Sequence, residues 1–223
     1  MPAEPLPEPG ATGRTRLRRL PELAVRERAT LHAVLDAGLV AHVALVDDGQ
    51  PYAVPVAYAR DADRVLLHGS TGSRLFRALA AGAPACVTVT LLDGLVLARS
   101  VFESSMNYRS AMVLGSCTPV TGEDRLPALE RLVEHLMPGR WTEARLPTAK
   151  ELAATSVLAM PLIECSVKIS EGDPQDPDED LAWPVWAGVV PIESRFGAAR
   201  PAADLDPDRP PPAYLEDWSD GRG

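Results

Sequence analysis

Alternating hydrophobic and polar residues cover much of the middle of this 223-residue chain. Runs of this kind are typical of half-buried β-strands, and they occupy residues 39–46, 51–59, 64–68, 84–92, 95–101, 111–120 and 163–169. Asp-Gly pairs at 48–49 and 93–94 separate two pairs of these runs, and such pairs favour tight hairpin turns. Short strands at this spacing predict an antiparallel barrel or sandwich rather than a parallel doubly wound sheet.

Helical spacing replaces the alternation in four places. We predict helices over residues 21–37, from 74 to the glycine at 82, over 121–137 and from 149 onward, because apolar side chains there recur on one face. Gly38 stands where a terminating C′ glycine belongs, and Pro138-Gly139 stops the third helix. Thr148 and Glu151 have the spacing of a capping box that opens the fourth.

The stretch from Gly69 to Leu79 joins a predicted strand to a predicted helix through glycines and small hydroxyl residues. Backbone N–H groups at a helix start, together with the positive end of the helix dipole, favour an anion such as phosphate. Arg74 adds a full positive charge. The alternative is an ordinary N-cap, in which a Ser or Thr oxygen accepts from first-turn N–H groups, and this stretch alone favours the cap.

Composition excludes several classes of protein. A net charge of −9 with 5% aromatic residues argues against a general nucleic-acid binder. The chain contains no run of eighteen apolar residues and no short apolar leader, so we expect a soluble cytoplasmic protein that does not contact membranes. Cys86, Cys117 and Cys165 are scattered and are expected to be buried thiols. The histidines at 32, 42 and 135 form no convincing metal site.

The two ends of the chain lack apolar periodicity. Residues 1–21 are rich in Pro, Glu and Arg, and residues 193–223 are again aperiodic. We therefore predict a flexible N-terminal arm over 1–21, one domain over 22–192 and a flexible C-terminal tail over 193–223.

Four blocks of sequence, in order, carry a resemblance to a known family. They are Asp48-Gly-Gln-Pro-Tyr-Ala-Val-Pro-Val-Ala-Tyr58, Leu67-His-Gly-Ser-Thr-Gly-Ser-Arg74, Ser105-Met-Asn-Tyr-Arg-Ser110 and Trp186-Ala-Gly-Val-Val-Pro191. With them, the region from about residue 26 to 191 resembles the pyridoxamine 5′-phosphate oxidase-like FMN-binding family, in the branch that includes nitroimidazole-resistance proteins. One departure is that the chain has Phe102-Glu103-Ser104 where many relatives carry a histidine.

The resemblance implies a mainly β fold, a six-stranded antiparallel split barrel with peripheral helices, that works as a homodimer with FMN between the subunits. The strand over 52–58 would run along the isoalloxazine edge, His68 and Gly69 would lie beside the ring, and Ser73 with Arg74 would hold the phosphate. The implied cofactor-binding residues are Val54, Pro55, Val56, His68, Gly69, Ser70, Thr71, Ser73, Arg74, Ser105, Asn107, Tyr108, Arg109, Ser110 and Trp186. In this family context a phosphate site is favoured over a plain cap at the 69–74 turn.

Several of these residues also have a structural interpretation. Val54, Pro55 and Val56 suit a barrel core as well as a flavin wall, although proline in a strand indicates an edge or a bulge. The 105–110 block alone reads equally well as a polar turn, and Trp186 as a buried core residue. His68 is the candidate for acid–base catalysis, since its ordinary pKa of ~6.5 permits proton exchange, but a hydrogen-bonded structural histidine is the commoner case.

The function that the resemblance implies is an FMN-dependent oxidoreductase that acts on a small or planar acceptor, with NAD(P)H as the donor. Oxidation of pyridoxamine phosphate itself is disfavoured, because a second phosphate needs its own cationic clamp and the only lysines are Lys150 and Lys168. Arg99, Arg109 and Arg195 are the alternative source of such a clamp. Two alternatives stay open, since one fold hosts several functions. The first is a non-catalytic binding or carrier protein for flavin, haem or deazaflavin, and the second is an interaction protein with an empty barrel.

Overall fold

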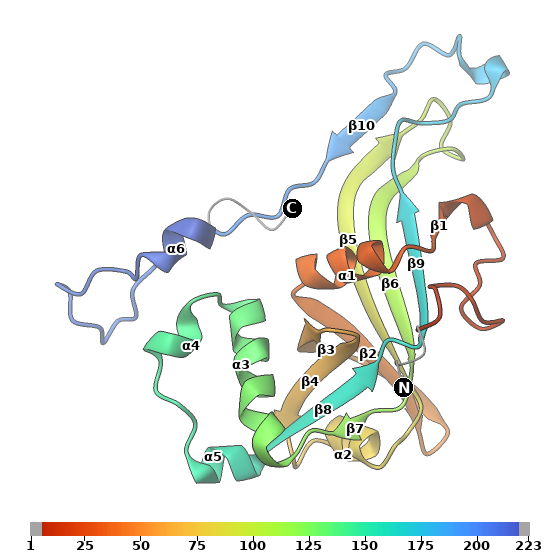
Figure 1. Cartoon of the computed structure of the whole chain (residues 1–223). Helices are drawn as coiled ribbons and strands as arrows, with labels where there is room; N and C mark the ends of the chain where they lie inside the picture. The colour runs from red at the N-terminus through yellow and green to blue at the C-terminus, as the bar shows by residue number, and fades with distance from the viewer. Residues whose placement is uncertain (1–5, 219–223) are drawn as a thin grey trace.

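An antiparallel sheet of ten strands forms the body of the computed structural model, which describes residues 6–218 (Figure 1). The strands follow the order β1-β9-β6-β5-β2-β3-β4-β8-β7, and β10 pairs with β5 outside this path. Their bounds are β1 Ala24–Val25, β2 Val40–Asp47, β3 Gln50–Asp61, β4 Arg64–Ser70, β5 Ala85–Leu97, β6 Ser105–Gly115, β7 Thr118–Pro119, β8 Thr155–Pro161, β9 Glu164–Ser170 and β10 Gly188–Pro191.

The mainly β, antiparallel fold was predicted, but the count of six strands was wrong and the sheet is not closed. The path ends at β1 on one side and β7 on the other, and these two strands do not pair with each other. β1 and β7 have two residues each and β10 has four. β1 and β10 are short segments of connecting chain that pair with N–H and C=O groups at free strand edges, which sequence periodicity does not report. β7 lies within the predicted run 111–120, which the structure divides between β6 and β7.

The two Asp-Gly pairs have different outcomes. The prediction at Asp48-Gly49 is confirmed, since both residues have positive φ (49° and 74°) between paired Asp47 and Gln50, as a two-residue hairpin turn of type I′ requires. The prediction at Asp93-Gly94 is wrong: β5 runs straight through it, and the register shifts there by a bulge. A β-bulge accommodates the extra residue without reversing the chain, so the turn between β5 and β6 lies at 98–104.

Most of the helices lie where they were predicted. They are α1 Arg28–Ala37, α2 Arg74–Ala80, α3 Arg125–Leu136, α4 Arg140–Glu143, α5 Ala149–Ala154 and α6 Tyr214–Asp217, with 3₁₀ turns η1 Pro21–Leu23, η2 Gly122–Asp124 and η3 Asp178–Asp180. The capping box of Thr148 and Glu151 is present in full. α1 starts later than predicted, because residues 21–25 form η1 and β1. Within the described part of the chain, no helix has the length and apolar character that crossing a bilayer demands.

The buried side chains form two hydrophobic clusters, and β3, β4 and β8 contribute residues to both. The larger one fills the concave side of the sheet and includes α1 and α2, whereas the smaller one lies between α3 and the β3–β4–β8 region. β8 was not predicted as a strand, because its side chains alternate between these two clusters and the sequence there is one continuous apolar run. Of the cysteines, Cys117 and Cys165 are buried as expected, but Cys86 is only half-buried.

Gly38 ends α1 for a reason other than the one predicted. Its φ is −78°, so it is not a left-handed C′ residue. A Cβ at this position would lie 2.5 Å from Val89 Cγ1 and 2.6 Å from the Tyr58 hydroxyl. Tyr58 is fully buried and its hydroxyl donates to Leu35 O at 2.6 Å. The glycine therefore permits the close approach of the end of α1 to Tyr58 of β3 and Val89 of β5.

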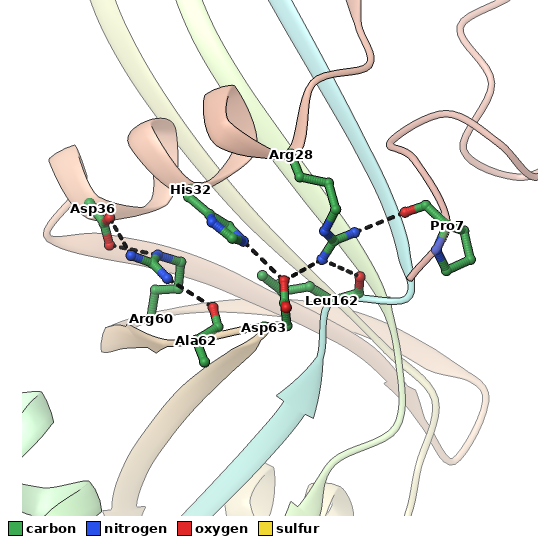
Figure 2. Close-up of polar contacts among 8 residues, drawn as sticks. All are labelled: Pro7, Arg28, His32, Asp36, Arg60, Ala62, Asp63 and Leu162. Atoms are coloured by element: carbon green, nitrogen blue, oxygen red, sulfur yellow. Dashed lines mark hydrogen bonds and ion pairs between the residues drawn. The ribbon is translucent and has the colours of Figure 1, made fainter. Parts of the chain in front are cut away.

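Both terminal segments contact the domain within the described residues. Gly10 N donates to Cys165 O at 2.7 Å. Arg28 Nη1 donates to Pro7 O at 2.8 Å (Figure 2). Near the other end, the Tyr214 hydroxyl donates to Glu143 Oε2 at 2.6 Å. The predicted domain boundaries at residues 21 and 192 stay predictions. Residues 1–5 of the predicted arm and residues 219–223 of the predicted tail lie outside the described residues.

Candidate functional site

The strands β3 and β4 pair over only part of their length. Their ladder runs from Asp61↔Arg64 at the turn to Tyr58↔Leu67, where it stops. Before Tyr58, β3 pairs with β2 alone, and after Leu67, β4 pairs with β8 alone. The facing edges, residues 50–57 of β3 and 68–70 of β4, are therefore unpaired toward each other, and we name them the β3–β4 split. Pro55 lies on this free edge, which confirms the edge position predicted from the proline.

The turn of residues 70–73 follows β4 at the end of the split. Ser70 Oγ accepts from Gly72 N at 3.1 Å, and Thr71 donates from its backbone N to Ala154 O at 3.0 Å. Ser73 stands at the N-cap of α2, yet its side chain makes no capping hydrogen bond. The ordinary cap predicted as the alternative is therefore absent here, and the Ser73 hydroxyl is available to a ligand.

Gly69 lets the 70–73 turn pack against the first helical turn of α2. A Cβ at Gly69 would lie 2.2 Å from Phe76 Cε2. Phe76 is 5% exposed and belongs to the main hydrophobic cluster, so its ring has no free space to move into. Glycine at 69 is thus required for packing, and this close contact fixes where the 70–73 turn lies relative to α2.

Arg74 extends from α2 across to the start of β3. Its guanidinium carbon lies 4.5 Å from the centre of the Tyr52 ring, and its Nε lies 3.5 Å from Asp47 Oδ2. The Tyr52 hydroxyl is buried and has no hydrogen-bond partner among the described residues. Tyr52 was not among the predicted site residues. The signal that could have identified it was its place at the start of the strand expected beside a flavin.

His68 lies on the β4 edge of the split and pairs across the ladder with Val157. Cross-strand partners share a face, so the imidazole lies on the side of the smaller hydrophobic cluster, to which Val157 belongs. Its Nδ1 is buried and has no hydrogen-bond partner within residues 6–218. Burial lowers the pKa of His68 below its usual value, which favours the neutral imidazole at pH 7.

Val54, Pro55 and Val56 differ in exposure along β3. Val56 is buried at 9% exposure and belongs to the main cluster, Val54 is half-buried against it, and Pro55 is exposed on the other face. The core interpretation therefore holds for Val56 and in part for Val54. All three still lie on the part of β3 that has no partner strand on the side of the split.

The 105–110 block forms the first half of β6, so its interpretation as a turn is wrong. Arg109 makes a two-pronged ion pair with Asp93 at the β5 bulge (3.0 and 2.8 Å), which raises the pKa of Arg109. Asn107 Nδ2 donates to Gly172 O at 3.0 Å, and Ser110 Oγ donates to Lys168 O at 3.4 Å. Because β5 and β2 lie between β6 and β3 in the sheet, one chain does not bring this block to the split.

Trp186 precedes β10 and is 64% exposed, so its interpretation as a buried core residue is wrong. Its ring lies over Gly188, where a Cβ would come within 2.8 Å of it. Some outward-facing positions of β2, β5 and β6 carry large apolar side chains. Large side chains there are 38–60% exposed; they are Val40, Val46, Leu92, Leu95, Leu97 and Met106. We name these six residues the outer apolar face.

The predicted site residues thus form separate groups in one chain. The split joins residues 54–56 with residues 68–74, whereas Ser105, Asn107, Tyr108, Arg109 and Ser110 lie on another strand and Trp186 on a connecting loop. The group at the split combines free backbone edges, an unpartnered hydroxyl and one arginine. Such a set can hold the polar edge of a planar ring system and its anionic side chain.

Comparison with known proteins gives consistent results. Residues 27–169 match the family model described as pyridoxamine 5′-phosphate oxidase. The structure is similar to the FAD and haem binding protein from Mycobacterium smegmatis, with 44% identity, a TM-score of 0.86, and coverage of 88% of this chain and 97% of that one. It is also similar to the flavocytochrome Anf3 from Azotobacter vinelandii, with 38% identity, a TM-score of 0.88, and coverage of 95% and 98%.

A putative 5-nitroimidazole antibiotic resistance protein from Bacteroides thetaiotaomicron shares the fold, with 19% identity, a TM-score of 0.55, and coverage of 66% of this chain and 86% of that one. No curated protein matches the chain. The family model spans most of the described domain, and two relatives exceed 30% identity over nearly the whole chain. The chain therefore belongs to the pyridoxamine 5′-phosphate oxidase-like, flavin-binding family.

Proposed function

We propose that this protein is a flavin-dependent oxidoreductase with the isoalloxazine ring in the β3–β4 split and the ribityl phosphate at Ser73 and Arg74. The observation that carries the proposal is the parting of the two strands beyond Tyr58↔Leu67, beside a turn whose Ser73 hydroxyl has no capping bond. Free N–H groups at a helix start and a guanidinium are suited to a phosphate.

Each element at the split has a distinct part in this proposal. The free edge of β3 offers backbone donors and acceptors to the polar edge of the ring, and Val54 with Val56 offers apolar contact. Gly69 lets the 70–73 turn lie against Phe76 of α2, and Ser70 and Thr71 hold the turn in place through their own hydrogen bonds. Bound flavin would supply hydride and single-electron transfer, and the protein supplies its binding, orientation and exclusion of water.

The identity of the flavin is open to direct measurement. The family resemblance implied FMN, whereas the printed names of the two relatives above 30% identity speak of FAD and of a flavocytochrome. The ribityl phosphate is common to FMN and FAD, so the proposed role of Ser73 and Arg74 is the same for both. The mass of the ligand released from the purified protein distinguishes FMN, FAD and deazaflavin.

We further propose a homodimer in which the second copy completes the site. The outer apolar face leaves six large apolar side chains partly exposed, and contiguous exposed apolar surface marks interaction sites. The β5–β6 turn adds Val101 and Phe102, which are 96% and 90% exposed. A second copy would bring its own 105–110 block and Trp186 toward the split, which one chain alone does not do.

The test follows the flavin through one turnover. Purified protein should be yellow, its flavin absorbance should bleach on addition of NAD(P)H, and a small planar acceptor such as a nitro compound should restore it. Light scattering should give the mass of a dimer. Bound flavin that does not reoxidise faster with acceptor than free flavin would reassign the protein as a flavin carrier, and colourless protein that takes up no flavin at micromolar concentration would refute the proposal.

A second candidate function adds haem to the flavin, because both relatives above 30% identity carry haem or cytochrome in their printed names. The residue that supports it here is His68, whose buried Nδ1 has no hydrogen-bond partner within the described residues. Haem iron is commonly held by a histidine, and a lowered pKa keeps the imidazole neutral, as a metal ligand must be.

Haem binding has a spectroscopic test of its own. Haem should be added to the purified protein and the Soret band followed, with His68→Ala compared to His42→Ala, a variant at an exposed histidine of β2. Loss of the band in His68→Ala alone supports haem ligation by His68. A band that persists in His68→Ala would exclude His68, and no band in the unaltered protein would remove this candidate function.

A further inference from the structure

A cavity lies between the N-terminal segment and the strands β1 and β9. Its volume is about 110 Å³. The lining residues come from the N-terminal segment with β1 and from β9: Pro9, Gly10, Arg16, Leu17, Pro21, Ala24, Val25, Arg26, Ser166 and Val167. We name it the arm cavity. Its walls are mainly apolar, with a serine hydroxyl on one side and two arginines among the lining residues.

The segment that covers the arm cavity is anchored at several points. Gly10 N donates to Cys165 O at 2.7 Å, and Arg14 pairs with Glu164. Arg28, at the start of α1, donates to Pro7 O, Leu162 O and Asp63, as Figure 2 shows. Thr15, 2% exposed, exchanges hydrogen bonds with Thr12. These contacts hold the segment against β9 and the start of α1.

The charges around the arm cavity are unbalanced. Neither Arg16 nor Arg26 has a hydrogen bond or ion pair from its guanidinium among the described residues, and both are exposed. The neighbouring Glu27 accepts from the backbone N of Arg26 at 3.2 Å. By contrast, Arg14, Arg28, Arg60, Arg64, Arg99 and Arg109 each pair with a carboxylate. Ser166 is 7% exposed, so one wall presents a largely buried hydroxyl.

We propose that the arm cavity binds a short-chain carboxylate, with its apolar body against Leu17 and Val25 and its carboxylate held by Arg16 and Arg26. The planar guanidinium matches a carboxylate with two parallel hydrogen bonds. A cavity of ~150 Å³ holds one benzene molecule, so a cavity of about 110 Å³ suits an acid of about three to four carbons. Propionate and butyrate have this size.

This proposal goes beyond the proposed flavin function and does not depend on it. In the sheet, β6, β5 and β2 lie between β9 at the arm cavity and β3 at the split. A defect at one site should therefore leave the other intact, and flavin content reports on the split alone.

Calorimetric titration of the full-length protein with butyrate, at constant ionic strength in chloride, tests the proposal. We expect saturable binding at one site per chain, and no binding of butyramide, the uncharged analogue. The double substitution Arg16→Gln with Arg26→Gln should weaken butyrate binding at least about tenfold, since each loses charge-assisted hydrogen bonds. The matched control Arg19→Gln, at an exposed arginine outside the cavity lining, should change it less than twofold.

Each other outcome contradicts the proposal. Absence of saturable butyrate binding, or equal weakening by the double variant and by Arg19→Gln, would show that no specific site exists. Tighter binding of inorganic phosphate than of butyrate would overturn the assignment to carboxylates. Because both arginines are exposed, the variants should keep the thermal midpoint and flavin content of the unaltered protein.

Discussion

The guanidinium of Arg74 lies 4.5 Å above the Tyr52 ring, so a residue of α2 closes over the first residues of β3. The distance is within the range of a cation–π contact, and Asp47 adds a weak ion pair at 3.5 Å. The contact holds a positive charge at the end of the split, beside Ser73. A phosphate bound there would meet an arginine that is already in position.

The first prediction separates the phosphate from the rest of the flavin. Arg74→Gln should weaken FMN binding by roughly 1.5–3 kcal/mol, the usual range for a hydrogen bond to a charged group, and should leave the affinity for riboflavin, which has no phosphate, unchanged. Fluorescence titration measures both. Arg77→Gln, at an exposed position one turn later, is the control. Equal losses for FMN and riboflavin would show that Arg74 holds the ring or the fold, and not the phosphate.

The second prediction concerns the close approach of the turn to α2. Gly69→Ala should lower the free energy of unfolding by about 1–3 kcal/mol, as overpacking of a core does, because the new methyl would overlap the buried Phe76 ring. Gly72→Ala should cost less than about 0.5 kcal/mol, since its Cβ would come no closer than 3.5 Å to Ser70 Oγ. Urea unfolding of both variants measures the difference, and similar losses would contradict the packing argument.

The third prediction is a pH dependence of stability. Burial lowers the pKa of His68 in the folded protein, whereas in the unfolded chain it should be ~6.5. Below that value the unfolded state binds more protons, so stability is full above ~6.5 and falls as the pH drops toward the folded pKa. His68→Gln should flatten this part of the stability curve between pH 7 and 5, and His42→Gln, at an exposed site, should not. An unchanged curve in His68→Gln would contradict the prediction.

The fourth prediction tests the contact of α1 with β3 through Tyr58. Tyr58→Phe removes the donor to Leu35 O and leaves a buried carbonyl unpaired, so we expect a loss of about 1–3 kcal/mol in the free energy of unfolding. Tyr108→Phe, at a half-buried position of β6, should cost less than that. Denaturant unfolding of the two variants gives the comparison. A loss in Tyr58→Phe no greater than in Tyr108→Phe would show that the bond contributes little.

Local signals in the sequence determined several parts of the fold. The alternation located most strands, the turn at Asp48-Gly49 has the predicted hairpin conformation, and the capping box of Thr148 and Glu151 opens α5 as expected. These features depend on residues that are near each other in the chain, and local backbone preferences decide them. The ordered blocks at 48–58 and 67–74 also indicated the family, which the comparisons confirm.

Only the tertiary structure decided the features that depend on distant partners. Asp93-Gly94 became a bulge and not a turn, since Arg109 and β10 both engage this part of β5, and β8 became a strand because two clusters cover its two sides. The split, the unpartnered hydroxyl of Tyr52 and the arm cavity likewise arise where segments remote in sequence meet. A sequence indicates periodicity and turn-forming residues. Which strand edges stay unpaired depends on how the whole chain packs around its two hydrophobic clusters.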